Sequence, residues 1–404
     1  MKQDWEIKKL GEVCLSLEDG DWIEKKNQSS AGIRLIQTGN IGCGFYKDKI
    51  DKAKYISEDT FNTLRCTEVI AGDILISRLP EPVGRACIVP KLRTKCITAV
   101  DCSIVKLNPN LILASWFIYY TQSADYTAKV VSECSGTTRD RISRKKLSVI
   151  TVPIPPLDEQ ERIVEILDRE FERIDALKAN AEQNLQHAKD LFQSALKQEL
   201  QPQEGWETKT IGEIAELKGG KRVPKGYKLE IEPTGYPYIR VADFNDNGTV
   251  DLDDIHYISE KVYEGIKRYT ITTNDVYISI AGTIGKSGII PEDLNGANLT
   301  ENACRLVFKE EVDKKYIYYC TISSDFKEQI AKLTMQAAQP KLALTRLATA
   351  TLNLPSVGTQ REIVARIDIL NERCKALEEN YKKTIALCDD MKQALLRKAF
   401  NGEL

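Results

Sequence analysis

Residues 154–164 have the sequence Ile154-Pro155-Pro156-Leu157-Asp158-Glu159-Gln160-Glu161-Arg162-Ile163-Val164, and no Pro or Gly follows before Pro202. Residues 354–364 have a related sequence, Leu354-Pro355-Ser356-Val357-Gly358-Thr359-Gln360-Arg361-Glu362-Ile363-Val364, and no Pro or Gly follows before Gly402. Proline interrupts helices and biases its preceding residue toward extended structure. Each block is therefore expected to end a globular region and to begin a long helix.

Apolar side chains recur in both proline-free tracts with alternating steps of four and three residues. This spacing predicts a coiled-coil seam of about five heptads on helices of about 37 residues, roughly 55 Å long. Glu170 and Asn184 interrupt the first seam and are expected to fix its pairing register. Two separate amphipathic helices, each lying on its own domain, are the alternative. The predicted seam residues are Ile163, Leu167, Ile174, Leu177 and Leu191 in the first helix, and Ile363, Ile367, Leu370, Leu377 and Leu395 in the second.

The rest of the chain also contains pairs of matching segments. Trp5-Glu6-Ile7-Lys8 recurs as Trp206-Glu207-Thr208-Lys209, and Tyr55-Ile56-Ser57-Glu58 recurs as Tyr257-Ile258-Ser259-Glu260. An offset that stays near 200 residues over the whole length indicates an internal repeat of one structural unit.

Each repeat divides into a globular part and a helix. The globular parts are rich in β-branched and aromatic residues with Gly, Pro and Asn turns, which is typical of mixed α/β (α+β) domains. We expect the two helices to pair antiparallel, giving a pseudo-two-fold molecule. Such a molecule suits duplex DNA, whose successive major grooves lie ~34 Å (about 10 bp) apart on one face. The expected boundaries are 1–157 and 201–357 for the domains, and 158–200 and 358–404 for the helices.

Composition excludes several classes of protein. A hydrophobic fraction of 42% over 404 residues argues against wholesale disorder. No stretch is apolar for 18 residues and the N-terminus has no signal core, so we expect a cytoplasmic protein without membrane contact. The eleven cysteines include no Cys-x-x-Cys pair, and His187 and His256 are the only histidines. We therefore predict no metal site, and no catalytic residues that depend on histidine.

The net charge of −2 is uneven along the chain. Counted by segment, residues 1–157 carry +5, residues 158–200 carry −5, residues 201–357 carry −3 and residues 358–404 carry +1. A freestanding basic DNA clamp is excluded, because only the first domain is basic. A DNA reader that takes part of its affinity from partner subunits is still compatible with these charges.

The chain resembles the specificity (S) subunit of type I restriction–modification systems over its full length. Three pieces carry the resemblance: Trp5 to Val13 with its copy at Trp206, the block 154–164, and the ending Ala394 to Leu404. The second block departs from the family pattern, since it lacks the second Pro and the Glu before Gln360. This departure makes the two expected partner-binding surfaces less symmetric.

The resemblance implies a function for every part of the chain. Each globular part is expected to be a target-recognition domain for one half of a bipartite double-stranded DNA site. The helices would separate these domains and bind two methyltransferase subunits, which methylate adenine with S-adenosylmethionine. Restriction/translocase subunits would cleave DNA with ATP and Mg. By this resemblance the chain is not an enzyme and holds no cofactor itself.

Candidate DNA-binding residues come from the basic loops. A Gly turn with a basic tip occurs at Val83-Gly84-Arg85 and at Gly282 to Ser287, where the spacing of a P-loop fails. Residues 129–146 and 218–225 combine cations with Gly, Ser or Thr, groups that suit phosphate contacts or guanine reading, and Gln339 suits adenine. Each loop has a plain alternative as a solvent-exposed connection. The candidates are Arg78, Arg85, Thr137, Arg139, Arg141, Lys221, Arg222, Lys225, Lys286, Gln339 and Lys341.

Two other classes of function compete with DNA recognition. A pseudo-symmetric coiled-coil adaptor that binds only proteins would share the repeat and the helices. An enzyme, such as a fused methyltransferase or nuclease, is disfavoured: Asn353-Leu354-Pro355-Ser356 lacks the aromatic residue of an adenine-methyltransferase loop.

Overall fold

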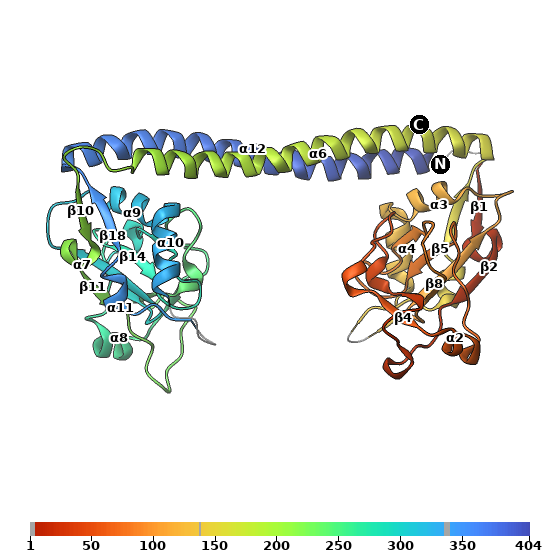
Figure 1. Cartoon of the computed structure of the whole chain (residues 1–404), viewed down its shortest axis with the longest axis horizontal. Coiled ribbons are helices and arrows are strands. Elements are labelled where there is room, and N and C mark those ends of the chain that lie inside the picture. The colour runs from red at the N-terminus through yellow and green to blue at the C-terminus, as the bar shows by residue number, and fades with distance from the viewer. Residues whose placement is uncertain (1–4, 137–138, 335–339) are drawn as a thin grey trace. The chain divides into compact units, whose positions relative to one another are not determined.

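The computed structural model describes residues 5–136, 139–334 and 340–404. The chain divides into two compact units, and both long helices pass from one unit into the other (Figure 1). Unit 1 consists of Met1–Glu182 and Lys383–Leu404, and unit 2 consists of Gln183–Lys382.

Unit 1 contains a two-stranded antiparallel ladder, a four-stranded sheet in the order β2-β8-β5-β6 and a three-stranded sheet in the order β4-β3-β7. Strands β3 and β7 are parallel, and the other pairs are antiparallel. The strands are β1 (Glu6–Lys9), β2 (Cys14–Asp19), β3 (Ile33–Ile36), β4 (Lys54–Ile56), β5 (Ile74–Ser77), β6 (Ala86–Ile88), β7 (Cys96–Thr98), β8 (Cys102–Leu107) and β9 (Thr151–Ile154). The helices are α1 (Leu10–Val13), α2 (Glu58–Leu64), α3 (Ala114–Tyr120), α4 (Ala124–Glu133) and α5 (Arg144–Ser148), with 3-10 turns η1 (Lys25–Asn27), η2 (Thr38–Asn40) and η3 (Ile50–Lys52).

Unit 2 repeats this topology, with sheets in the order β11-β17-β14-β15 and β13-β12-β16 and a ladder of β10 with β18. Its strands are β10 (Glu207–Thr210), β11 (Ala215–Gly219), β12 (Pro237–Ile239), β13 (His256–Tyr257), β14 (Val276–Ser279), β15 (Ser287–Gly288), β16 (Asn298–Leu299), β17 (Ala303–Phe308) and β18 (Thr351–Leu354). Its helices are α7 (Ile211–Ile214), α8 (Glu260–Ile266), α9 (Lys314–Ile322), α10 (Ser324–Leu333) and α11 (Leu344–Leu347), with 3-10 turns η4 (Val241–Asp243) and η5 (Glu292–Leu294). The predicted internal repeat and the mixed α/β (α+β) class are confirmed.

The repeat extends to local capping interactions. Ser123 accepts a hydrogen bond from the Tyr126 amide at the start of α4, and Ser323 does the same for the Phe326 amide in α10. A serine at this position satisfies one of the amides that the first helical turn leaves without a partner. Both repeats therefore begin the same helix with the same chemistry.

The two long helices are α6 (Leu157–Glu199), with 43 residues, and α12 (Val357–Asn401), with 45 residues, both longer than the heptad pattern predicted. In unit 1 they pair antiparallel. The ammonium of Lys178 lies 2.7 Å from the Asp389 carboxylate, and Arg162 donates to the Leu404 carbonyl at 2.7 Å. In unit 2, Arg366 lies 2.7 Å from Glu199. The predicted antiparallel coiled coil is confirmed.

The predicted seam is correct for only part of its residues. Ile163, Leu167, Ile174, Ile363 and Ile367 are buried, and Leu370 and Leu395 are half-buried. By contrast, the side chains of Leu177, Leu191 and Leu377 are exposed by 48%, 51% and 40%.

The physical reason is that two helices bury only one of the two apolar heptad positions toward the middle of each helix. Small residues occupy that position, namely Ala181 and Ala188 in α6 and Cys374 and Cys388 in α12. Small side chains make a narrow contact, so the larger residues at the second heptad position face solvent.

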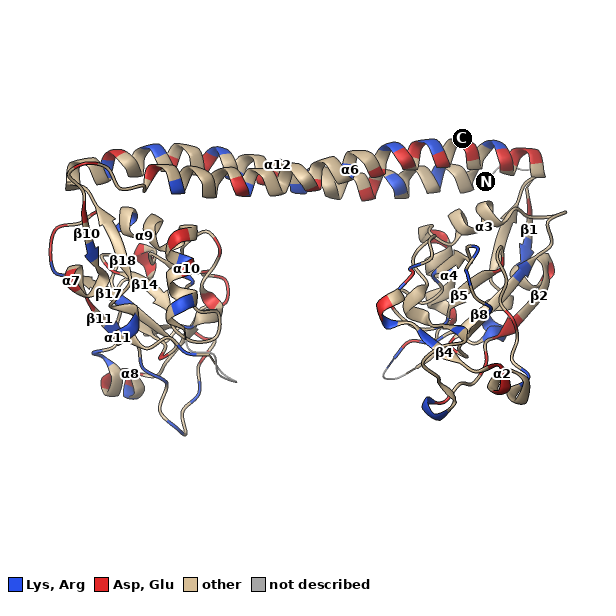
Figure 2. Cartoon of the chain, in the orientation of Figure 1, with Lys and Arg blue, Asp and Glu red and all other residues tan. Residues whose placement is uncertain are grey.

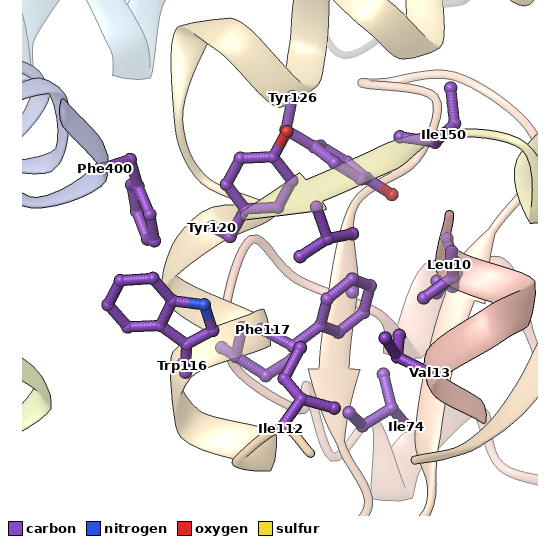
Figure 3. Close-up of a cluster of buried hydrophobic side chains, with 14 of the residues drawn as sticks. Leu10, Val13, Ile74, Ile112, Trp116, Phe117, Tyr120, Tyr126, Ile150 and Phe400 are labelled. Atoms are coloured by element: carbon purple, nitrogen blue, oxygen red, sulfur yellow. The ribbon is translucent and has the colours of Figure 1, made fainter. Parts of the chain in front are cut away.

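The core of each unit includes residues from the helix of the other repeat. In unit 1, Leu396, Ala399 and Phe400 of α12 join the core that is built around Trp116 and Tyr120 (Figure 3). The centroid of the Phe400 ring lies 4.8 Å from that of Trp116 and 5.1 Å from that of Tyr120, and both pairs have edge-to-face geometry. In unit 2, Leu196 of α6 is buried in the core, and Phe192 and Leu200 pack against it.

A buried glutamine fastens each long helix to the globular part of its own repeat. The Gln160 side chain accepts from the Leu113 amide at 2.9 Å and donates to the carbonyls of Leu111 and Pro155 at 2.9 and 2.8 Å. Gln360 likewise accepts from the Asp313 amide and donates to the Pro355 carbonyl, both at 2.9 Å. The proline-flanked blocks quoted at the outset thus fix where each helix begins.

Candidate nucleic-acid interface

In unit 1 four loops that are distant in sequence meet at one end of the β2-β8-β5-β6 sheet. The Gly20 amide donates to the Cys102 carbonyl at 2.9 Å, and the Arg78 amide donates to the Asp101 carbonyl at 2.8 Å. The Ile142 amide donates to the Arg78 carbonyl at 3.2 Å. These backbone bonds join the predicted basic loop that ends near Arg144 to the sheet, and they give the loops a common surface.

Arginine side chains are held at this surface by carboxylates. The Arg141 guanidinium lies 3.2 Å from Asp101, and the Arg144 guanidinium lies 3.6 Å from Asp19. The arginine side chains are 48% and 49% exposed, and Arg139 beside them is exposed as well. Guanidinium has five donors in a fixed fork, so each ion pair orients the group and leaves donors toward solvent.

Arg78 does not belong to this exposed group, and its prediction as a DNA contact is corrected. It is 5% exposed, and its guanidinium pairs with Asp19 at 2.8 Å and donates to the Val100 carbonyl. This ion pair with a buried guanidinium fixes the position of Asp19, the same carboxylate that holds Arg144. Arg78 therefore supports the surface from beneath.

Arg85, the basic tip of the first Gly turn, is also buried, with 8% exposure. Its Nε donates to the Ile41 carbonyl and its Nη2 to the Thr38 carbonyl, both at 2.8 Å. Its Nη1 donates to the carbonyls of Leu79 and Pro82, both at 2.9 Å. With these donors used on backbone carbonyls, Arg85 ties together two loops and does not present a charge to a phosphate.

Lys286 has the matching position in unit 2, after a Gly in the same left-handed conformation: φ is +85° at Gly84 and +86° at Gly285. Its ammonium lies 3.0 Å from the carboxylate of Asp246 and lowers the pKa of that carboxyl below its usual value. Asp246 lies in the loop 244–250, which corresponds to the loop that Arg85 holds in unit 1. The cation after the Gly is thus a loop anchor in both units.

The remaining basic candidates of unit 2 gather as they do in unit 1. The Gly220 amide donates to the Ala303 carbonyl at 3.0 Å, and the Lys221 amide donates to the Leu299 carbonyl at 2.8 Å. The Leu342 amide donates to the Ile280 carbonyl at 2.9 Å, next to the bridge between Ala281 and Lys341. The exposed side chains brought to this end of the sheet are Lys221, Arg222, Lys225 and Lys341. Figure 2 shows basic residues on the loops of each unit that lie away from α6 and α12.

The family model described as the type I restriction modification DNA specificity domain matches the chain twice, over residues 2–187 and 203–387. The chain belongs to this family. The two matches coincide with the two repeats, so one specificity domain covers each globular part and most of the helix that follows it.

Curated relatives agree with this family, and solved structures share the fold. The Escherichia coli type I restriction enzyme EcoBI specificity subunit is 28% identical over 310 residues, which are 71% of this chain and 65% of that subunit. The chain therefore matches just under two thirds of that relative. A structure from work on the assembly and conformational transition of a type I R-M system has a TM-score of 0.82 at 20% identity, covering 100% of this chain and 99% of that one. The HsdS subunit from Thermoanaerobacter tengcongensis has a TM-score of 0.58 at 20% identity and covers 100% and 98%.

Two sequence candidates, Thr137 and Gln339, lie outside the described residues. Sequence reasoning missed three residues of this interface. Two of them are Asp19 and Asp101, the carboxylates that orient arginines in unit 1. The third is Asn302, which has in unit 2 the position that Asp101 has in unit 1. Aligning the repeats at an offset of 201 would have paired Asp101 with Asn302 and drawn attention to both.

The paired helices of unit 1 offer a second candidate surface. Leu177 and Met391 are 48% and 49% exposed, and they border an open groove of about 310 Å³. Exposed apolar side chains that line a groove are typical of protein-binding surfaces. The groove is lined by Glu170, Arg173, Ile174, Leu177, Met391, Ala394, Leu395 and Lys398.

Within residues 5–136, 139–334 and 340–404, no group of three or more His, Cys, Asp or Glu side chains is placed to hold a metal ion. None of the helices in that described part of the chain has the length and apolar character needed to cross a membrane.

Proposed function

We propose that this chain selects the DNA target of a type I restriction–modification complex by reading a bipartite sequence, one half with each globular part. The observation that carries the proposal is the repetition of one topology with a cluster of exposed basic loops at the same end of the same sheet. In unit 1 this cluster has Arg139, Arg141 and Arg144, and in unit 2 it has Lys221, Arg222, Lys225 and Lys341. Such loops supply both phosphate contacts and base readout.

The two half-sites are proposed to differ. Three exposed arginines, two of them oriented by Asp19 and Asp101, favour guanine at a base edge in unit 1. Unit 2 exposes mainly lysines, which suit phosphates as point charges. The proposed functional division is 1–157 and 201–357 for the recognition domains, with 158–200 and 358–404 as the helices between them.

The chemistry is proposed to lie in partner subunits. Two methyltransferase subunits with S-adenosylmethionine would methylate adenine, and restriction/translocase subunits with ATP and Mg would cleave DNA. This chain would contribute no cofactor and no catalytic residue. The exposed apolar residues of the helices, Leu177 and Met391 in unit 1 and Leu191 and Leu377 in unit 2, support a role as the docking sites of the methyltransferase subunits.

The test is to express the chain with the methyltransferase subunit of its system and to map methylated adenines over a genome. We expect one split motif with unequal halves, and no methylation when this chain is omitted. Methylation without sequence preference, or none at all, would contradict the proposal. A gel shift with random duplexes separates the adaptor alternative: retention of DNA by the complex supports recognition, and its absence favours an adaptor that binds only proteins.

A further inference from the structure

A pocket in unit 2 lies beside the basic loop 220–229 and is unlike the rest of that surface. It is open, has a volume of about 420 Å³, and is lined by residues of that loop, of η4 and of the segment that precedes β17. Tyr227, which is 41% exposed, lies on its wall, and Thr300 and Asn302 contribute polar groups.

The cations that border this pocket are neutralised by carboxylates. The Arg222 Nε lies 2.5 Å from Glu301. The guanidinium of Arg240 is bonded through Nε to the almost fully buried Asp243 at 2.9 Å and through Nη2 to Asp254 at 2.9 Å. Two carboxylates on one arginine leave this side of the pocket with a formal excess of negative charge. The pocket is therefore a poor site for a phosphate and a suitable one for an uncharged base edge.

Asn302 is the polar group that the fold leaves available there. Its backbone carbonyl accepts from the amides of Ile280 and Ala281 at 2.7 and 3.2 Å, which fixes the residue at the end of the sheet. Its half-buried side-chain amide makes no hydrogen bond to any described residue. An amide offers one carbonyl oxygen and two N–H donors, and an amide that is half-buried without a partner is free to bind a ligand.

The equivalent position in unit 1 has a carboxylate, Asp101, in place of the amide. The Arg78 amide donates to the Asp101 carbonyl as the Ile280 amide donates to that of Asn302, so the two residues correspond. The Asp101 carboxylate is paired with Arg141 at 3.2 Å, whereas Asn302 has no such cation. At one place in the repeat, then, unit 1 presents an oriented guanidinium and unit 2 presents a free amide.

We propose that Asn302 is a specificity-determining residue that reads an adenine in the half-site of unit 2. The side-chain oxygen accepts a hydrogen bond from the adenine N6 amino group while Nδ2 donates to N7, the bidentate pairing that distinguishes adenine in the major groove. Tyr227 provides an apolar wall beside the base, and the two carboxylates that bind Arg240 keep phosphates out of the pocket. This inference rests on the proposed function.

The test uses the complete complex and maps the methylated motif for the wild type and for variants. Asn302→Ala should lower the preference for adenine at one position of one half-site by roughly 10- to 100-fold, and the other half-site should be unchanged. Asn302→Asp should move the preference at that position toward cytosine, because a carboxylate accepts from cytosine N4 but cannot donate to adenine N7. Asn110→Ala is the matched control, because Asn110 is exposed and follows β8 at the end away from Asp101.

The outcomes separate this inference from the proposed function. A wild-type complex without any split motif would refute the proposed function. A split motif in the wild type that is the same in both Asn302 variants would refute the inference alone. If Asn302→Ala unfolds unit 2, as measured by hydrogen exchange, Asn302→Asp decides: an unchanged motif overturns the inference, and a changed base at one position supports it.

Discussion

Phe400→Ala tests whether the C-terminal end of α12 completes the core of unit 1. Phe400 is 5% exposed and its ring contacts those of Trp116 and Tyr120 at 4.8 and 5.1 Å. Removing a buried phenyl ring costs about 3–5 kcal/mol, which includes the cavity that is left behind. For a unit of this size about 4 kcal/mol corresponds to a loss of roughly 10 °C in melting temperature.

Hydrogen exchange followed by mass spectrometry is the suitable assay, because it reports each unit separately. Peptides from β5 and α3 should lose protection in the Phe400→Ala variant, while peptides from β14 and α9 in unit 2 should keep theirs. Leu387→Ala is the matched control, since Leu387 lies on the same helix but is 58% exposed. This control should change stability by less than about 0.5 kcal/mol. Equal loss of protection in both units, or no loss in unit 1, would refute the reasoning.

Three further predictions concern two buried polar side chains, Gln160 and Arg85, and one exposed apolar side chain, Leu177. Gln160→Ala should destabilise unit 1 by about 2–4 kcal/mol, because the Leu113 amide and the carbonyls of Leu111 and Pro155 lose their partner; exchange that speeds up in unit 2 instead would contradict it. Arg85→Lys keeps the charge but loses most of the carbonyl contacts, so it should lower thermal stability by about 2–3 kcal/mol. An unchanged thermal stability of the Arg85→Lys variant would contradict this structural role. Leu177→Lys should leave folding unchanged and reduce co-purification with the methyltransferase subunit, and unchanged co-purification would argue against docking there.

The repeat was predictable because its two copies keep matching residues at one offset of about 200, and the antiparallel pairing follows from that repeat. The long helices were predictable because heptad periodicity and proline positions are local features of the sequence. The exposure of Leu177 and Leu377 was not, since a heptad pattern marks apolar positions without stating how many helices cover them. The length of about 37 residues inferred from the heptad pattern was also shorter than the 43 and 45 residues of α6 and α12. The apolar pattern fades before the helices end, and their last turns are stabilised by packing on the globular part of the other repeat.

The sequence also could not show which of the candidate DNA-binding arginines are exposed. Sequence reasoning placed Arg139 and Arg141 near the surface because their loop contains several cations and polar residues. It also chose Arg85, since a cation after a glycine turn suits a phosphate. The carbonyl of Thr38, which binds Arg85, lies 47 positions away in sequence, and a contact of that separation has no local signal. The burial of each side chain in the folded structure therefore distinguishes the cations that hold loops together from those that face solvent.

The most direct test of the central claim is an exchange of recognition domains. Residues 1–157 of this chain are replaced by the corresponding domain of another family member with a known split target, and the methylated motif of the complex is mapped over a genome. If each globular part reads one half, one half of the motif changes to that of the donor and the other half stays the same. A change in both halves, or in neither, would contradict the account.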